Sequence, residues 1–290
     1  MNVTIKGIGI AAPFGGKAEL KATVLGEIPP NAPPLYKTTT DKLSKFIPAR
    51  KLRRIDHFTR MALLAAFRAL DDANKVKDLP QNLGIILCTG YGPSQTTFDF
   101  LDSIIDDGAK LASPLAFSHS VHNIPTGVLS LLLGAPCPQT TICQLTNPVM
   151  TGLQTAALWL AEKRVESVLF GAVDETTPLL EENAHRLAME KGREISTPVS
   201  EGAVFFLLNN QEHGYATIET NTSLSELNNI PLFSHRELPN ALNLGTLFGA
   251  LPVTGAFNLA AAALSIEGTD RNAGYNEGNT WLQVSGRTHA

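Results

Sequence analysis

The chain has 290 residues, is 43% hydrophobic and carries a formal net charge of −4 at pH 7. This length can bury a large core in one or two domains, and the charge gives no basic field that would attract nucleic acid or an anionic membrane. Three cysteines without CxxC spacing argue against a disulfide framework or a zinc site and favour a reducing cytoplasm as the location.

The chain opens with MNVTIKGIGIAAP, which lacks the charge and cleavage pattern of a signal peptide. This segment predicts a strand over Val3–Ile10. The proline density of Ile28–Pro34 predicts an exposed loop. Apolar residues then recur at three- and four-residue spacing over Ile55–Ala73, which predicts a long helix, and a strand is expected at Leu83–Cys88. No apolar run reaches about 18 residues, so no membrane-spanning helix is expected.

Two histidines follow in the segment SHSVHN. His119 and His122 are three residues apart, but no carboxylate stands at ligand spacing, so a satisfied or solvent-facing role is favoured over a metal site. The apolar run Val128–Pro136 is interpreted as the end of a buried helix.

The most informative stretch is Gln139–Glu175. It is predicted to contain a strand at Thr140–Ile142, an irregular elbow at Leu145–Met150, a helix at Gly152–Lys163 and a strand at Ser167–Phe170. Enzymes of the α/β class often place a nucleophile where such an elbow opens into a helix, because the helix dipole and free N–H groups favour an anion there. No residue of this elbow is a convincing nucleophile.

Three ionisable residues flank the elbow and the strand after it. Cys143 is interpreted as a small buried residue at a strand end, with a displaced nucleophile as the alternative. Asp174 and Glu175 follow a strand end and are expected to be solvated acids at the start of a loop, although acid–base chemistry is the alternative.

The rest of the chain continues the alternation of helices and strands. A helix is predicted at Leu179–Lys191, a weak boundary at Gly192–Pro198, a strand at Ala203–Leu208, a helix at Gly255–Leu264 and a strand at Thr280–Val284. Such alternation predicts crossover connections and buried sheets, and therefore a layered α/β fold.

Six segments carry a resemblance that follows one order along the chain. They are VTIKGIGIAAPFG near the start, Arg53–Ala73, Leu83–Pro93, Ser113–Pro136, Ser200–Leu208 (SEGAVFFLL) and Thr254–Leu264. In this order they resemble successive elements of a β-ketoacyl synthase of the thiolase superfamily. The resemblance implies a thiolase-like layered α-β-α-β-α fold with halves at about 1–170 and 171–290, truncated in the second half.

The Cys-His-His site of that family is not matched. Counting back from Gly152 places the nucleophile at Val149, counting forward from the strand places it near Thr146, and neither is a cysteine. Counting back from Gly255 places the second histidine at Gly249 or Ala250, and no segment matches that of the first histidine. The family's glycine-rich, phenylalanine-containing C-terminal loop is also not recognised. Gln144 lies close to the place where some relatives replace the cysteine by glutamine.

The resemblance therefore implies a chain length factor, the inactive partner of a ketosynthase heterodimer, similar to small subunits of bacterial aryl polyene systems. The expected partners are an active β-ketoacyl synthase and, through the complex, an acyl carrier protein; no cofactor or metal is expected. Two alternatives stay open, which are a thiolase-fold acyltransferase that uses Cys143 and a stand-alone protein that binds an acyl group or a carrier.

Two surfaces follow from the same resemblance. The strand residues Gln139, Thr140, Thr141 and Ile142 are expected at the dimer interface, because unpaired strand edges seek partners. The side chains of Leu115, Phe117 and Val121 are expected to limit chain length in the partner's tunnel, with core packing as an equal alternative. Arg53 and Arg54 are expected either to contact an acidic carrier or to form a solvated helix start.

Overall fold

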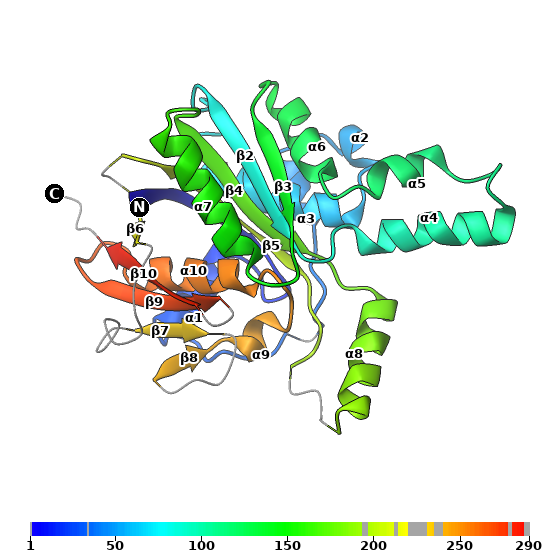
Figure 1. Ribbon diagram of the computed structural model, residues 1–290. Coiled ribbons are helices and arrows are strands. Elements are labelled where there is room, and N and C mark those ends of the chain that lie inside the picture. The colour runs from blue at the N-terminus through cyan, green and yellow to red at the C-terminus, as the bar shows by residue number, and fades with distance from the viewer. Residues whose placement is uncertain are drawn as a thin grey trace.

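The computed structural model describes residues 2–33, 35–192, 197–211, 214–219, 231–234, 240–277 and 280–286. In these residues the strands join in the order β3-β2-β4-β5-β1-β6-β10-β9-β7-β8 (Figure 1). Their bounds are β1 (Asn2–Ala11), β2 (Leu83–Thr89), β3 (Gln139–Cys143), β4 (Ser167–Asp174), β5 (Gly202–Asn209), β6 (Ala216–Glu219), β7 (Leu232–Ser234), β8 (Ala241–Asn243), β9 (Asn272–Glu277) and β10 (Thr280–Gly286).

The first part of the sheet consists of β3, β2, β4, β5 and β1. β2 pairs in parallel with β3 and β4, whereas β5 runs antiparallel to β4 and β1. All residues of β2, β4 and β5 are buried, which explains why these segments read as continuous apolar runs rather than alternating patterns. The strands predicted in this part of the chain are confirmed.

Helices cover both faces of this first part. α3 (His57–Asp72) and α6 (Ile124–Leu133) share one apolar cluster with Ile85 and Leu87 of β2. α7 (Pro148–Ala161) packs on the opposite face, in a second cluster with Ile86 and Cys88. The long helix predicted at Ile55–Ala73 is confirmed as α3, which starts two residues later because the carboxylate of Asp56 caps it by accepting a hydrogen bond from the N–H of Thr59.

The second part of the sheet consists of β6, β10, β9, β7 and β8. α10 (Thr254–Ser265) packs on β9, β7 and β10, and it also meets α7 and α1 (Lys17–Val24). α7 and α10 thus lie between the two parts of the sheet, as Figure 1 shows. The layered, thiolase-like fold is confirmed. On β10 the side chains of Gln283 and Ser285 hydrogen bond to Glu219 of β6.

Three helices extend away from these layers in Figure 1. α4 (Ser94–Asp107) buries only Ser94, and α5 (Pro114–His119) and α8 (Pro178–Glu190) bury no residue. The helix predicted at Leu179–Lys191 is therefore confirmed as α8, although its apolar side covers no core. The remaining short helices are η1 (Asp41–Lys45), α2 (Ala49–Leu52) and α9 (Gly245–Phe248).

Some expectations about organisation are not decided by the fold. The division into 1–170 and 171–290 stays a prediction, and its boundary falls inside β4. The weak boundary predicted at Gly192–Pro198 lies mostly outside the described residues. Within the described ranges, the helices are too short or too polar for any of them to cross a membrane.

Candidate functional site

The carboxyl ends of β2, β3 and β4 meet at one edge of the sheet, which is where α/β folds commonly place a site. Thr89 at the end of β2 pairs with Cys143 at the end of β3, and β4 ends at Asp174 beside them. α7 begins shortly after β3, so its N-terminus opens at the same place. We define the elbow site as Cys143, residues 144–147 and the first turn of α7.

The elbow is shorter than the sequence predicts. α7 begins at Pro148, so Val149 and Met150 belong to its first turn and not to the elbow. The prediction that this helix starts at Gly152 was wrong, because proline at the first helical position needs no N–H partner and has the φ angle of a helix. Asn147 before it turns the chain with a left-handed φ of 54°.

The positions at which a nucleophile was sought hold no thiol. Thr146 is exposed in the elbow, whereas Val149 is completely buried in the first turn of α7. Gln144 is exposed, and its side-chain oxygen accepts a hydrogen bond from the Thr151 hydroxyl at 2.9 Å. This hydrogen bond joins the elbow to the first turns of α7.

Cys143 is exposed and not buried as expected, because β3 lies at the edge of the sheet. Its Sγ lies 3.6 Å from the carbonyl oxygen of Gly90. Partial burial and the nearby charge of Asp174 raise the pKa of this thiol. A nucleophilic cysteine needs the opposite shift, since the thiolate is the reactive form.

A carboxylate that sequence reasoning missed closes the elbow site. Glu277 of β9 is 3% exposed, and it accepts hydrogen bonds from the backbone N–H groups of Val149 at 2.9 Å and Met150 at 2.5 Å. Burial raises the pKa of Glu277 to about 7, although the two N–H groups act in the other direction. The C-terminal segment therefore does reach the elbow, even though the sequence showed no family-like loop there.

Asp174 is completely buried, which corrects the expectation of a solvated acid. Its carboxylate accepts hydrogen bonds from the Thr89 hydroxyl and from the N–H groups of Gly90 and Tyr91. Burial raises its pKa to about 6 in spite of these donors. Asp174 thus holds the turn that follows β2 and shapes the floor of the elbow site.

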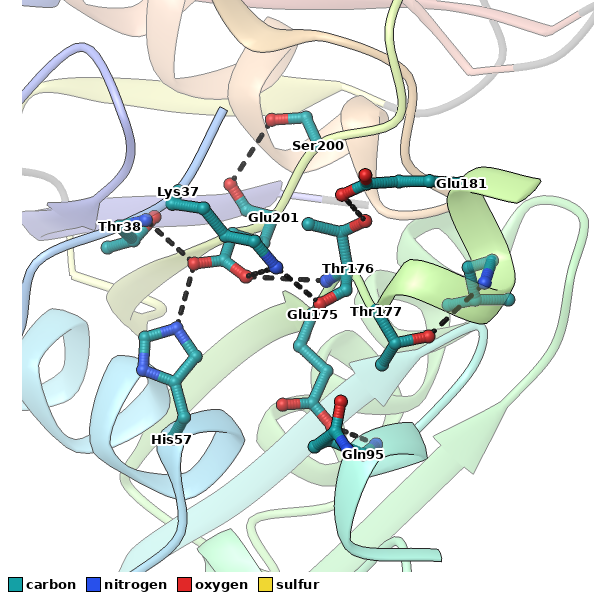
Figure 2. Close-up of polar contacts among 11 residues, drawn as sticks. Lys37, Thr38, His57, Gln95, Glu175, Thr176, Thr177, Glu181, Ser200 and Glu201 are labelled. Carbon is teal, nitrogen blue, oxygen red and sulfur yellow. Dashed lines mark hydrogen bonds and ion pairs between the residues drawn. The ribbon is translucent and has the colours of Figure 1, made fainter. Parts of the chain in front are cut away.

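A second polar cluster, shown in Figure 2, surrounds Glu201 at the start of β5. The buried carboxylate lies 2.7 Å from His57 Nε2, accepts the N–H of Thr38 at 2.7 Å and lies 3.6 Å from Lys37 Nζ. Burial alone would raise the pKa of Glu201, but His57 outweighs it and leaves the pKa lowered. Burial would lower the pKa of His57, but Glu201 outweighs it and leaves that pKa raised. The contact joins α3 to the residue that precedes β5.

Glu175 borders this cluster and is also buried, again against expectation. It accepts the N–H of Gln95 at 2.8 Å, and burial raises its pKa to about 7. His119 lies 3.2 Å from Asp56, as expected for a satisfied side chain, and His122 is exposed. The SEGA motif was found in the sequence, but the partners of its glutamate come from distant segments and leave no local signal.

Gly249, the position sought for the second histidine, has a left-handed φ of 72°. A Cβ atom there would lie 2.2 Å from Cβ of Ser200 and 2.8 Å from the ring of Tyr36. A side chain at this position is therefore strained by the backbone and blocked by its neighbours. An imidazole does not fit in the present arrangement.

The side chains predicted to limit chain length lie on the surface. Leu115, Phe117 and Val121 are 50%, 58% and 40% exposed, so simple core packing is wrong for them. Phe117 contacts Phe100 of α4, with ring centroids 5.4 Å apart. β3, predicted as an interface strand, has a neighbour on one side only among the described strands, and its residues are partly or fully exposed.

Comparisons with known sequences relate the chain to one family. Residues 29–225 match the family model described as beta-ketoacyl synthase, N-terminal domain. A curated relative, 3-oxoacyl-[acyl-carrier-protein] synthase 2 of Synechocystis sp., is 27% identical over 97 residues. That match covers 33% of this chain and only 23% of the relative.

Solved structures resemble the whole chain. A type II PKS acyl-carrier protein in complex with its ketosynthase bound to the hexaketide (AntDE:AntF) gives a TM-score of 0.79 at 19% identity and covers 99% of both chains. The ishigamide ketosynthase/chain length factor gives 0.72 at 16% identity and covers 98% of both. The ketosynthase ApeO in complex with its chain length factor ApeC from Xenorhabdus doucetiae gives 0.64 at 18% identity, covering 99% of this chain and 100% of that one.

Proposed function

Because the chain belongs to the beta-ketoacyl synthase N-terminal domain family, we propose that it is a non-catalytic ketosynthase-like subunit, a chain length factor. In this role it forms a heterodimer with an active β-ketoacyl synthase. It shapes the acyl tunnel of that partner while a polyketide, polyene or fatty-acid-like chain grows on an acyl carrier protein.

The observation that carries the proposal is the absence of a competent nucleophile at the elbow site. The family's reaction needs a thiolate to take the acyl chain and imidazoles to assist decarboxylation and stabilise the developing charge. Thr146 and Val149 offer no thiol, and the raised pKa of Cys143 disfavours its thiolate. The backbone at Gly249 disfavours an imidazole. This geometry gives no support to the alternative of an acyltransferase that uses Cys143.

The free edge of β3 supports the proposed pairing. β3 stands last in the strand order, next to the elbow, and Gln139–Ile142 present one row of backbone groups to a further strand. An exposed strand edge readily pairs with another chain. A subunit without its own chemistry that keeps such an edge is suited to bind an active subunit.

Large apolar side chains are exposed on α6, α7 and the elbow, which adjoin β3, and on the α4–α5 arm, which extends away from the layers (Figure 1). Large exposed side chains on α4, α5, α6, the elbow and α7, together with nearby connections, are between 40% and 81% exposed: Leu101, Ile105, Leu111, Leu115, Phe117, Val121, Leu131, Leu145 and Leu158. α6 and α7 both contact β3, so part of this surface continues its edge. Exposed apolar side chains beside a strand edge are suited to a protein interface, and an obligate interface buries more than about 2,000 Å².

Within this surface we propose that Leu115, Phe117 and Val121 reach the partner's tunnel. Their exposure leaves them free to do so, and the contact with Phe100 holds the Phe117 ring in place. A rigid aromatic wall limits chain length, because extra carbons can enter a packed wall only with strain of about 1–3 kcal/mol.

Two basic side chains are available for the proposed carrier contact. Arg53 and Arg54 are exposed just before α3, in a chain whose overall charge is negative. Opposite charges on two partners speed and orient their encounter. We propose that the carrier meets the complex partly through these two side chains.

The test is co-expression with a β-ketoacyl synthase that has an intact Cys-His-His site. Light scattering of the purified material is expected to give a one-to-one heterodimer, which elongates a malonyl-loaded carrier. Replacing the partner's catalytic cysteine with alanine should abolish activity, whereas Cys143→Ala in this chain should leave it unchanged. Elongation by the isolated chain would disprove the proposal, and a stable monomer that binds an acyl carrier alone would favour the stand-alone binding protein.

A further inference from the structure

The N-terminus of α7 has two backbone N–H groups that need a partner. The N-cap residue Asn147 makes no side-chain capping bond, and Pro148 at the first helical position has no N–H. The first available donors are therefore Val149 and Met150, and the positive end of the helix dipole adds to their attraction for an anion.

Glu277 supplies two acceptor oxygens from a distant part of the chain. One carboxylate oxygen accepts from Val149 N–H and the other from Met150 N–H, so both oxygens are engaged. Glu277 follows Val149 by 128 positions and Met150 by 127 positions along the chain. The contact therefore joins β9 of the second part of the sheet to α7 over the first part.

The neighbouring helix leaves room for this side chain. A Cβ atom on Gly255 of α10 would lie 3.0 Å from both Cγ and Cδ of Glu277. Glycine at this position allows the carboxylate to pass α10 and reach α7. Three elements thus converge on one buried carboxylate.

The same contact covers a buried thiol. Cys88 of β2 is completely buried, and its Sγ lies 3.1 Å from the carbonyl oxygen of Pro148. A Cβ atom added to Gly152 of α7 would lie 2.4 Å from the same sulfur. The start of α7 therefore packs over the sulfur of Cys88 and shields it from solvent, and Glu277 is hydrogen bonded to the first turn of this helix.

We propose that Glu277 is a permanent internal ligand of the α7 N-terminus, which keeps the first turn of this helix closed and denies the position to anionic groups. This inference rests on the proposed function. A subunit that does no chemistry at the elbow site has no need of an open anion-binding position, so Glu277 can occupy the N-terminus of α7.

The test compares two thiol reagents of similar size in the full chain. Iodoacetamide is neutral and iodoacetate is an anion, so the second alone is attracted by a vacated helix N-terminus. Modification of Cys88 and of the exposed Cys143 is measured by peptide mass spectrometry in native protein, Glu277→Ala and Glu277→Gln. Glu219→Ala is the matched control, since Glu219 is also a hydrogen-bonded carboxylate of the second part of the sheet.

In the native chain we expect modification of Cys143 and protection of Cys88. Loss of the two hydrogen bonds in Glu277→Ala should raise Cys88 modification by about tenfold or more, and more with iodoacetate than with iodoacetamide. If Glu277→Ala does not fold, Glu277→Gln provides the test, because it keeps the size of the side chain and replaces the carboxyl group with an amide. The ratio of Cys88 modification by iodoacetate to that by iodoacetamide should then rise in this variant.

Three results would overturn the inference: continued protection of Cys88, an equal rise with both reagents, or the same rise in Glu219→Ala. None of these results would affect the proposed function, which fails only if the isolated native chain condenses acyl groups or does not pair with an active synthase. The two ideas can therefore be rejected separately.

Discussion

Gly249 illustrates how a single backbone angle decides which chemistry a position can hold. We predict that Gly249→Ala lowers the free energy of unfolding by about 2–4 kcal/mol, because it adds a clash with Ser200 to the strain of a left-handed φ. Gly26→Ala is the control, since Gly26 has a φ of 76° and open space around it, and it should cost only about 1 kcal/mol. Urea denaturation of both variants measures the difference, and equal costs would show that the clash is relieved.

Three buried carboxyls predict an unusual dependence of stability on pH. The pKa values of Asp174, Glu175 and Glu277 are raised from 3.8 or 4.5 to about 6 or 7, so each binds its proton more tightly in the folded chain than in the unfolded one. The free energy of unfolding should therefore fall as pH rises from about 4.5 to 7. The raised pKa of His57 acts in the same direction, whereas Glu201 opposes it only at lower pH.

We predict that the protein is more resistant to urea at about pH 5 than at about pH 8. Glu277→Gln should reduce this difference by about 2–3 kcal/mol, because one of the titrating groups is gone. Glu162→Gln removes an exposed carboxyl at the end of α7 and should leave the difference unchanged. A native chain that is more stable at the higher pH would contradict the burial of these carboxyls.

Among the elements, β3 and the elbow next to it are expected to hold the partner. Leu145→Glu places a charge on a side chain that is 65% exposed beside the strand edge, so it should weaken the heterodimer without affecting the fold. Met189→Glu on α8, where the side chain is 81% exposed, is the control and should leave assembly intact. Size-exclusion chromatography of the co-expressed pairs measures the outcome, and equal effects of the two changes would argue against this surface.

The α4–α5 arm carries the proposed limit on chain length. Phe117→Ala in the heterodimer should shift the products toward longer chains, because a smaller side chain leaves room for further carbons. Leu179→Ala on α8 has a similar exposure, 51% against 58%, and should leave the products unchanged. Mass spectrometry of the released chains gives the distribution, and the same product lengths for Phe117→Ala and the native complex would exclude a tunnel role for this ring.

Over the whole molecule, elements with strong periodicity could be predicted from the sequence. Continuous apolar runs predicted the buried strands β2, β4 and β5. Apolar residues at three- and four-residue spacing predicted the helices α3 and α10. The start of α7 was misplaced, because glycine was taken as the opening of the helix although Pro148 starts it. The short strands β6, β7 and β8 have too few residues to show a period.

Contacts between distant segments could not be predicted in this way. The bond from Val149 to Glu277 and the pair of His57 with Glu201 depend on how the layers stack, and neither leaves a local pattern. The burial of Asp174 was missed for the same reason, because a loop after a strand is usually exposed. The family resemblance predicted the layers, but it gave no information on the position of the Glu277 carboxylate.

The free edge of β3 has a consequence for how the protein is produced. Copies made in excess of the companion would keep an unpaired strand beside apolar surface, which favours self-association and precipitation. We therefore expect the yield of well-behaved material to follow the supply of the companion rather than the expression level of this chain. On the proposed function, balanced synthesis of the two polypeptides is therefore expected to determine the yield.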